Sequence, residues 1–466
     1  MLNREKGKSD KRNFEDKIFE VMKSKKVYPT QRQTYKKIAV NFKDYDFNRL
    51  SKQSGFKKRK EKKISGKSMV IGFMMMAIQG HNTYEQWAQE IGLSLKKNIS
   101  KQAIFKRMTD CFAELALVLL NQVFAQHVKQ TTSKVSAKGK LKKYKHVFVQ
   151  DSTIIKLPQW LNKIYPGNYS QGETKALIRI QIIIELHANK IVQFEITPYT
   201  KNDQSMSSLV AKVANKGDMI IRDLGYFVLD VLEQLKNQKI AFVSRIKPGV
   251  KVFDIKTEKE IDLLKLLSKK GTLDQWVFVG TKSKVPLRLV AVKLPDQIAN
   301  EKIRKEKNNR DKRLNHDRKY YALMHYKIYL TNEDTTKLTL VEIIKIYNLR
   351  WRIETIFKTW KSQLHLQQLL SANVKMTKAR ADSILYLMLI FIMQFQMKIY
   401  NDVIAELVNQ KRNVDISLTK ISKYIITHFE EILEMKIKKL TDIIAYHCCY
   451  DKRNDRLNFI QKLKLS

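Results

Sequence analysis

Residues 146–158 read His-Val-Phe-Val-Gln-Asp-Ser-Thr-Ile-Ile-Lys-Leu-Pro. The run is rich in Val, Ile and Phe, which predicts a buried β-strand that carries Asp151. Further elements follow it: a β-hairpin of residues 175–186 and 190–197, helices at 205–213 and 227–236, and strands at 218–223 and 240–246. A strand, a hairpin and then alternating helix and strand predict a mixed α/β domain.

The composition indicates a polyanionic partner. The chain has 466 residues, with 89 Lys and Arg against 45 Asp and Glu, a formal charge of +44. Its 44% of hydrophobic residues excludes a disordered chain, and its length predicts several domains. A field this strong favours nucleic acid as the partner, with an anionic membrane surface as the alternative.

Neither a membrane span nor a disulfide framework is expected. The apolar runs Met69–Ile78 and Ile384–Met393 are each about half as long as a bilayer span, so they predict buried helices. Residues 1–11 are charged and do not resemble a signal peptide. The cysteines are Cys111, Cys448 and Cys449. Their spacing does not suit disulfides, which favours a reducing compartment.

The N-terminal third is predicted to bind DNA. Residues 1–68 contain 22 Lys and Arg against 8 Asp and Glu, most densely at Lys57–Lys63. This predicts a phosphate-binding arm, or alternatively a solvated and partly disordered one. Residues 69–133 predict helices, one capped by Thr83 and a short one that begins at Ser100. They form either a helix-turn-helix or a plain helical hairpin. In the first case four side chains would face DNA: Lys101, Gln102, Lys106 and Arg107.

The rest of the chain divides by composition and period. Residues 134–246 are expected to hold the first part of the α/β core. Residues 247–325 predict a β-rich insertion with strands at 250–255, 276–280 and 287–294 and a basic helix at Glu301–Lys319. Residues 326–375 would complete the core, with a strand at 327–330 and a helix at Leu340–Trp360. Residues 376–466 predict a helical C-terminal domain.

Two aspartates are the first candidates for a chemical role. Asp151 lies inside or at the end of an apolar strand and Asp223 at the end of another, where an ionised carboxylate is costly unless a cation or donor compensates it. Each alone is more often a residue of a turn. Together, in one α/β domain, they suit a pair of ligands for Mg²⁺ or Mn²⁺, because these hard ions prefer oxygen ligands.

A third carboxylate belongs to the predicted helix Leu340–Trp360. Tyr347, Arg350, Glu354 and Lys361 are separated by 3, 4 and 7 residues. At about 100° per residue they lie on one narrow stripe. The stripe is either a solvated ladder of ion pairs or a functional surface. Trp351, Phe357 and Trp360 are expected to anchor the helix in a core, so that Glu354 becomes a third metal ligand and Arg350 and Lys361 hold phosphates.

The Tyr-x2-Arg-x3-Glu-x6-Lys spacing, the strand-end Asp151, and Asp223 before Leu-Gly-Tyr resemble the bacterial insertion-sequence transposases of the DDE class. The most similar group is the cut-and-paste group with the Tyr-Arg-Glu-Lys signature. The resemblance extends from about residue 69 to about residue 370. It implies an RNase H-like catalytic core with a β-rich insertion, flanked by helical domains, in a protein of the bacterial cytoplasm associated with the nucleoid.

The resemblance also implies residue roles. Asp151, Asp223 and Glu354 would bind two divalent cations, Mg²⁺ or Mn²⁺, for in-line phosphoryl transfer on DNA. Transposon ends would be released through a DNA hairpin. The residues expected to contact DNA near the hairpin are Tyr347, Arg350 and Lys361, with Lys358 and Arg352 as further candidates by position. Where the family places a Trp that stacks on a flipped base, this chain has Lys327, so Tyr326 or Tyr329 would have to receive the base.

Two other functions remain open from the sequence. One is a metal-dependent nuclease of the same fold that does not join strands, and the other is a catalytically inactive DNA-binding relic. The partners expected are the inverted-repeat ends, target DNA and a second protomer on DNA. The protomer contact is predicted within Ile416–Leu463, where apolar residues recur at helical spacing: Ile421, Ile425, Ile426, Phe429, Ile432 and Leu433.

Overall fold

The structure is a computed structural model that describes residues 28–57, 64–81, 83–130, 139–170, 172–187, 190–308, 317–351, 353–354, 357–358, 361, 370, 376–412, 414 and 416–450. The chain divides into two compact units. Unit 1 comprises residues 1–130, 157–164 and 358–449. Unit 2 comprises residues 131–156, 165–357 and 450–466.

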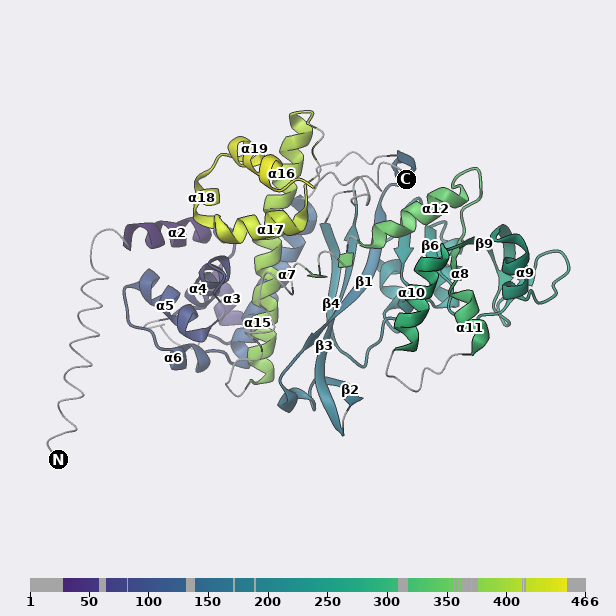
Figure 1. Ribbon diagram of the computed structural model, residues 1–466. Helices are drawn as coiled ribbons and strands as arrows, with labels where there is room; N and C mark the ends of the chain where they lie inside the picture. The colour runs from purple at the N-terminus through teal and green to yellow at the C-terminus, as the bar shows by residue number, and fades with distance from the viewer. Residues whose placement is uncertain are drawn as a thin grey trace. The chain divides into compact units, whose positions relative to one another are not determined.

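Unit 2 is built on a mixed β-sheet (Figure 1). Its first strands are β1 (Val147–Lys156), β2 (Pro166–Ser170), β3 (Glu173–Glu185), β4 (Lys190–Pro198), β5 (Met219–Arg222) and β6 (Ala241–Arg245). β3 pairs antiparallel with β1, β2 and β4, whereas β1, β5 and β6 pair parallel. The order β4-β3-β1-β5-β6 is the arrangement expected of an RNase H-like core, so the predicted fold class is confirmed. β2 was not predicted.

The two faces of this sheet can be told apart by the residues that point from them. Phe148 and Ile220 lie in register on neighbouring strands and belong to a buried cluster with Leu209 and Leu232. Leu209 comes from the 3-10 helix η3 (Ser207–Lys212) and Leu232 from α8 (Leu229–Asn237). Because side chains alternate along a strand, Asp151 projects from the other face. We call the first the core face and the second the Asp151 face.

The predicted insertion extends the same sheet. It contains β7 (Val252–Asp254), α9 (Leu263–Lys270), β8 (Thr272–Val279), β9 (Val285–Lys293), α10 (Asp296–Lys307) and α11 (Arg318–Leu323). The strand predicted at 327–330, in the core completion, is β10 (Tyr326–Thr331). β10 joins the insertion to the core, because it pairs antiparallel with both β6 and β9. The helix predicted at Glu301–Lys319 is wrong in its bounds, since α10 ends at Lys307 and Asp317 caps a separate helix.

The predicted helix Leu340–Trp360 changes its geometry near the middle. α12 (Leu340–Tyr347) begins with a capping box between Thr339 and Glu342. A 3-10 turn, η6 (Asn348–Arg350), follows directly. Glu354 is helical again. A uniform α-helical stripe is therefore wrong, because a 3-10 turn advances each residue by more than the 100° assumed.

Unit 1 is helical in its described part. Its helices are α2 (Tyr28–Val40), α3 (Phe47–Gln53), α4 (Gly66–Ile78), α5 (Tyr84–Leu95), α6 (Lys101–Phe105), α7 (Asp110–Gln130), α15 (Lys378–Phe391), α16 (Lys398–Asn409), α17 (Leu418–Thr427), α18 (Phe429–Glu434) and α19 (Ile437–His447). Thr83 and Ser100 cap α5 and α6, as predicted. α2 and α3 fall within the predicted basic arm, and α3 buries Phe47 and Leu50.

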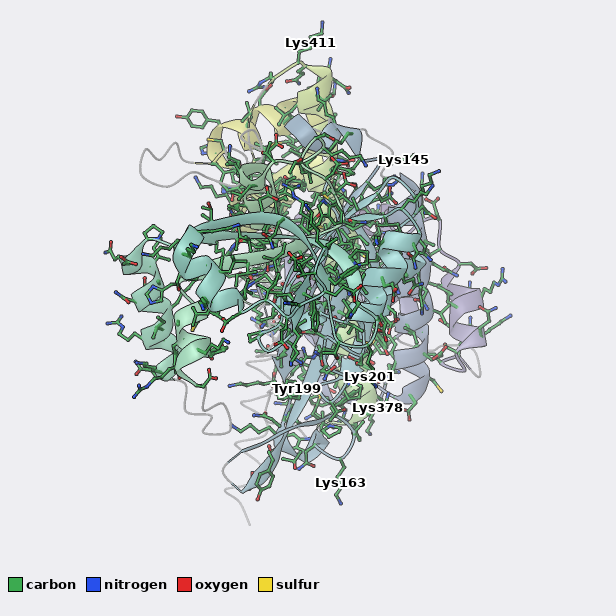
Figure 2. The ribbon with its side chains drawn as sticks, turned by 90° about the vertical axis from the view of Figure 1, so that its right-hand side faces the viewer. Lys145, Lys163, Tyr199, Lys201, Lys378 and Lys411 are labelled. Carbon is green, nitrogen blue, oxygen red and sulfur yellow. The ribbon has the colours of Figure 1, made fainter. Side chains whose placement is uncertain are left out.

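The longest apolar stretch of unit 1 joins α15 and α16 through a π-helix, η7 (Ile392–Met397). Figure 2 shows Lys378 and Lys411 at its opposite ends. Residues 378–409 are long and apolar enough to cross a membrane, but 78% of the most apolar window is buried inside the protein. The prediction that Ile384–Met393 is buried is confirmed.

The apolar residues expected to contact a second protomer lie inside unit 1. Ile421, Ile425, Phe429 and Ile432 are all buried. The ring of Phe429 packs against that of Phe395 in η7, with centroids 5.5 Å apart. These four side chains are therefore not available to a second protomer, whereas Ile426 and Leu433 are half-buried, and the contact predicted within Ile416–Leu463 stays a prediction. Amphipathic spacing indicated that one face is covered but could not distinguish the protein's own core from a partner.

Candidate active site

Asp151 lies within β1, just past the point where β1 stops pairing with the parallel strand β5, and Asp223 directly follows the end of β5. The last paired residues of β1 and β5 are Gln150 and Arg222, and each aspartate directly follows one of them. The carboxyl ends of parallel strands meet at the same edge of a sheet, which is where α/β proteins bind ligands. The structure thus brings together two carboxylates that are 72 residues apart in the sequence.

Arg350 links these aspartates to Glu354. Its Nη1 lies 3.3 Å from Asp151 Oδ2, its Nε 3.5 Å from Asp223 Oδ1, and its Nη2 2.7 Å from Glu354 Oε1. One guanidinium therefore contacts the carboxylates from β1, from the end of β5 and from the helical turn after η6. Three carboxylates around one cation leave a negative balance of charge.

The site is largely shielded from water at its centre. The side chains of Arg350 and Asp151 are 11% and 14% exposed, whereas those of Asp223 and Glu354 are about one-third exposed. Burial raises the pKa of Asp151 to about 7, although the Ser152 backbone N–H and Arg350 act in the opposite direction, and repulsion from Asp223 and Glu354 adds to the rise. Burial alone would lower the pKa of Arg350, but Asp223, Tyr347, Glu354 and Asp151 raise it overall.

Tyr347 completes the cluster from the last residue of α12. Its hydroxyl donates to Asp223 Oδ1 at 3.0 Å. Its ring packs on Tyr329 of β10, with centroids 4.8 Å apart. Burial first, and then the negative charge of Asp223, raise the pKa of this phenol, so the hydroxyl stays protonated and remains a donor. Through Tyr347, α12 therefore contacts both β10 and the aspartate that follows β5.

The donor set suits a hard divalent cation, but the carboxylates are arranged around Arg350. Within the described residues, no group of three or more His, Cys, Asp or Glu side chains is placed to hold a metal ion. Carboxylate oxygens are nevertheless the ligands that Mg²⁺ and Mn²⁺ prefer. Burial first, and then repulsion from Asp223 and Glu354, raise the pKa of Asp151, and a cation bound among these carboxylates would favour its ionised form.

The remaining predicted DNA contacts lie elsewhere in the chain. Lys358 and Lys361 are exposed helical residues that belong to unit 1, and Arg352 lies outside the described residues. Lys101, also in unit 1, forms an ion pair with Glu85 of α5. Lys106 and Arg107 follow α6, and Arg107 Nη1 donates to the Ala103 carbonyl at 3.1 Å. α6 has five residues, which is short for a recognition helix.

Of the two tyrosines considered for stacking, only Tyr326 is accessible. Tyr329 is 2% exposed, so it cannot receive a base. Tyr326 is half-buried and lines a cavity of about 860 Å³ in unit 2. The cavity is also lined by Arg245, Lys302 and Lys319. Burial, together with the positive charges of Arg245 and Lys327, lowers the pKa of Lys302.

The sequence did not predict that Arg350 would contact the carboxylates, since it was assigned to phosphate. Its spacing of four residues from Glu354 was a usable signal for that ion pair. Trp351 was expected in the core but is 56% exposed, whereas Phe357 is buried as predicted and Trp360 lies outside the described residues.

Comparisons with known proteins identify the family of this chain. A family model described as the transposase DDE domain matches residues 143–388. The transposase of insertion sequence element IS231D from Bacillus thuringiensis subsp. finitimus is 26% identical over 69% of this chain and 71% of its own length. That of IS231E from the same organism is 26% identical over 85% of each chain. A synaptic complex of the piggyBac transposase with hairpin DNA has a TM-score of 0.39 at 12% identity, covering 88% of this chain and 84% of that one.

Proposed function

The chain belongs to the transposase DDE domain family and is an enzyme that acts on DNA, and we propose that it excises and integrates its own insertion sequence by cut-and-paste through a hairpin at each end. The reaction takes place in the bacterial cytoplasm. The substrates are the inverted-repeat ends and the target DNA, and two protomers pair the two ends.

One observation carries the proposal. Asp151, Asp223 and Glu354 come from three separate elements, yet all three contact Arg350. The family implies a divalent metal in general. We assign two ions, Mg²⁺ or Mn²⁺, to these three carboxylates. When bound, such ions activate the attacking water or 3′-hydroxyl and stabilise the leaving 3′-oxygen.

The other side chains of the cluster orient the carboxylates and balance part of their charge. The Tyr347 hydroxyl holds the Asp223 carboxylate in place through its hydrogen bond. Arg350 neutralises part of the carboxylate charge in the metal-free protein. Its planar fork would also suit a phosphate of the transposon end if cations balanced the carboxylates. Lys361, Lys358 and Arg352 follow on the same segment and contribute further phosphate contacts.

The hairpin step needs a surface that receives an extruded base. Tyr326 supports this step, because it lines a cavity together with basic side chains. An aromatic face stacks on a base, and the cations hold its phosphate. In unit 1, Lys101, Lys106 and Arg107 contact the transposon end.

Cleavage of a labelled transposon end with flanking DNA tests the proposal. The wild-type protein with Mg²⁺ or Mn²⁺ should release the flank and leave a hairpin, and should join the end to a target plasmid. Asp223→Asn should abolish cleavage but retain end binding in a gel-shift assay. Asp230→Asn, an exposed aspartate of α8, is the matched control and should cleave normally.

The products separate the proposal from its main rival. Cleavage without any joined product would identify a nuclease that only cuts DNA. End binding without cleavage by the wild-type protein would identify a DNA-binding relic. Wild-type cleavage by Asp223→Asn would contradict the assignment of the site.

A further inference from the structure

A second charged cluster lies on the core face of the sheet, opposite Asp151. Asp203, in the connection between β4 and η3, accepts three hydrogen bonds at Oδ1. The donors are Ser152 Oγ at 2.7 Å, Arg179 Nη1 at 2.7 Å and Gln181 Nε2 at 3.1 Å. The Arg179 side chain is 9% exposed and Asp203 24%, so this ion pair is largely removed from water.

This cluster is joined to Asp151 through the next residue in the chain. The Ser152 backbone N–H donates to Asp151 Oδ1 at 2.8 Å, while the Ser152 hydroxyl donates to Asp203. The pairing of β1 with β5 ends at Gln150, so β3 is the only described strand paired with the following residues. Asp203 therefore holds β1 from the core face at the point where β5 no longer supports it.

Asp203 also lies against the loop that follows Asp223. A Cβ atom on Gly225 would lie 2.9 Å from Asp203 Oδ2, so the loop approaches this carboxylate closely. The next residue, Tyr226, donates its hydroxyl to Gln181, which is itself bound to Asp203. One carboxylate thus contacts both segments that carry the catalytic aspartates.

The base of the cluster is fixed by aromatic packing. The guanidinium of Arg179 stacks over the Tyr199 ring, 4.9 Å from its centroid. Tyr199 lies beyond the end of β4, at the end of the sheet opposite Lys145 (Figure 2). Because the Arg179 fork is held on one side by this ring and on the other by Asp203, the position of Asp203 is well determined.

We propose that Asp203 is a positioning residue that fixes Asp151 and Asp223 relative to each other and so sets the affinity of their site for the divalent cation. Asp203 acts through Ser152 and through the Gly225 loop and does not touch the reacting atoms. The inference rests on the proposed function. Groups that orient metal ligands typically change metal affinity or activity about 10- to 100-fold when they are removed.

The test measures Mn²⁺ binding and DNA cleavage in the full-length protein. Asp203→Asn keeps the shape of the side chain but removes its charge, and Ser152→Ala removes only one hydroxyl. Both should weaken Mn²⁺ binding in calorimetry about 10-fold or more. The Mn²⁺ concentration for half-maximal cleavage should rise by the same factor, excess Mn²⁺ should restore the rate, and the Kd for end DNA should not change.

Two further variants make the test specific. Thr197→Val removes a buried hydroxyl of β4 that bonds the Arg179 carbonyl, and it should leave the Mn²⁺ dependence unchanged. In Asp203→Asn/Ser152→Ala, the loss of Mn²⁺ affinity should be less than the sum of the single losses, because both act through one contact. Ser152→Ala keeps the test valid if Asp203→Asn does not fold.

The outcomes separate this inference from the proposed function. A wild-type protein that neither binds Mn²⁺ nor cleaves end DNA would overturn both. A wild-type protein that does both, with folded Asp203→Asn and Ser152→Ala variants of unchanged Mn²⁺ affinity, would overturn only the positioning role. A lower melting temperature with an unchanged Mn²⁺ dependence would likewise reduce Asp203 to a structural residue.

Discussion

Arg288 and Arg350 are both buried cations of unit 2, but they bind carboxylates in opposite ways. Arg288 Nε and Nη2 donate to the two oxygens of Asp274 at 2.6 and 2.7 Å. Its Nη1 donates to the carbonyls of Glu333 and Leu338. The single carboxylate of Asp274 thus balances the charge of Arg288, and that carboxylate and two backbone carbonyls accept from its N–H groups.

Arg350, in contrast, is shared among more charge than it can balance. Its three carboxylate contacts range from 2.7 to 3.5 Å, and its Nε has no hydrogen-bond acceptor among the described residues. Breaking a matched buried ion pair is costly, whereas an excess of buried carboxylates is itself a cost, which a bound proton or a further cation removes. The difference distinguishes a structural arginine from one in a functional site.

The largest change in stability is expected when the ion pair of Arg288 with Asp274 is removed. Arg288→Met should lower the free energy of unfolding by about 3 kcal/mol, because it leaves Asp274 and two carbonyls without their buried partner. Urea unfolding at pH 7.5 measures the change, and Mg²⁺ should not restore the loss. If Mg²⁺ restored the stability of Arg288→Met, the proposed difference between the two arginines would be wrong.

Removal of the shared arginine should have a smaller, metal-dependent effect. Arg350→Met should lower the stability of the metal-free protein by about 1–2 kcal/mol, because the carboxylates then repel one another in a partly exposed site. Mg²⁺ should recover most of this loss, since it binds the folded state only. Equal losses with and without Mg²⁺, measured in the same urea titration, would contradict the comparison.

The raised pKa of Asp151 predicts a pH dependence that Arg288 does not share. In the folded metal-free protein this pKa is about 7, against an ordinary value of 3.8. The folded state therefore binds the proton more tightly, so the stabilisation is complete below about pH 4 and is lost as the pH rises through 7. Asp151→Asn should remove this component from the melting temperature measured between pH 4 and 8. The same slope in the variant would assign it to other groups.

The smallest expected effect concerns exposed cations of unit 1. Lys101→Ala and Lys106→Ala should change stability by less than about 0.5 kcal/mol, because neither side chain is buried. Each should reduce the slope of log affinity for end DNA against log salt by about 1, if each neutralises one phosphate. Fluorescence anisotropy at several salt concentrations measures both slopes. An unchanged slope would place the DNA contacts of unit 1 elsewhere.

Local patterns predicted the elements of unit 2 and their order. The β-branched runs gave β1, β3, β4, β5 and β6. Most of β3, β5 and β6 is buried on both faces, and such strands appear in the sequence as nearly continuous apolar runs. Turn and capping residues gave the hairpin and the starts of α5 and α6, since each cap involves side chains only three residues apart. Nothing local marked β2, which has one Pro and one Gly in five residues.

The candidate site was predicted in its residues but not in its contacts. Asp151 and Asp223 stood out because each directly follows a run of apolar residues that forms part of a strand, and Glu354 because of its spacing from Tyr347 and Arg350. The sequence around Asp203 did not mark it as functional. Its hydrogen-bond partners belong to β1 and β3, and the loop after Asp223 packs against it, so all of these contacts are distant in the sequence. The sequence also assigned six apolar side chains of α17 and α18 to a partner, although four of them are buried within unit 1 itself.

The sequence by itself determined which segments form strands and helices and which of them end in a carboxylate, because period, capping and turn chemistry act over a few residues. Only the tertiary structure decided that Arg350 lies among three carboxylates, one of them 199 residues away in the chain. It alone also decided that Asp203 holds the opposite face of the same strand. Charge compensation and burial are sums over contacts between distant segments, and those contacts exist only once the sheet has brought the segments together.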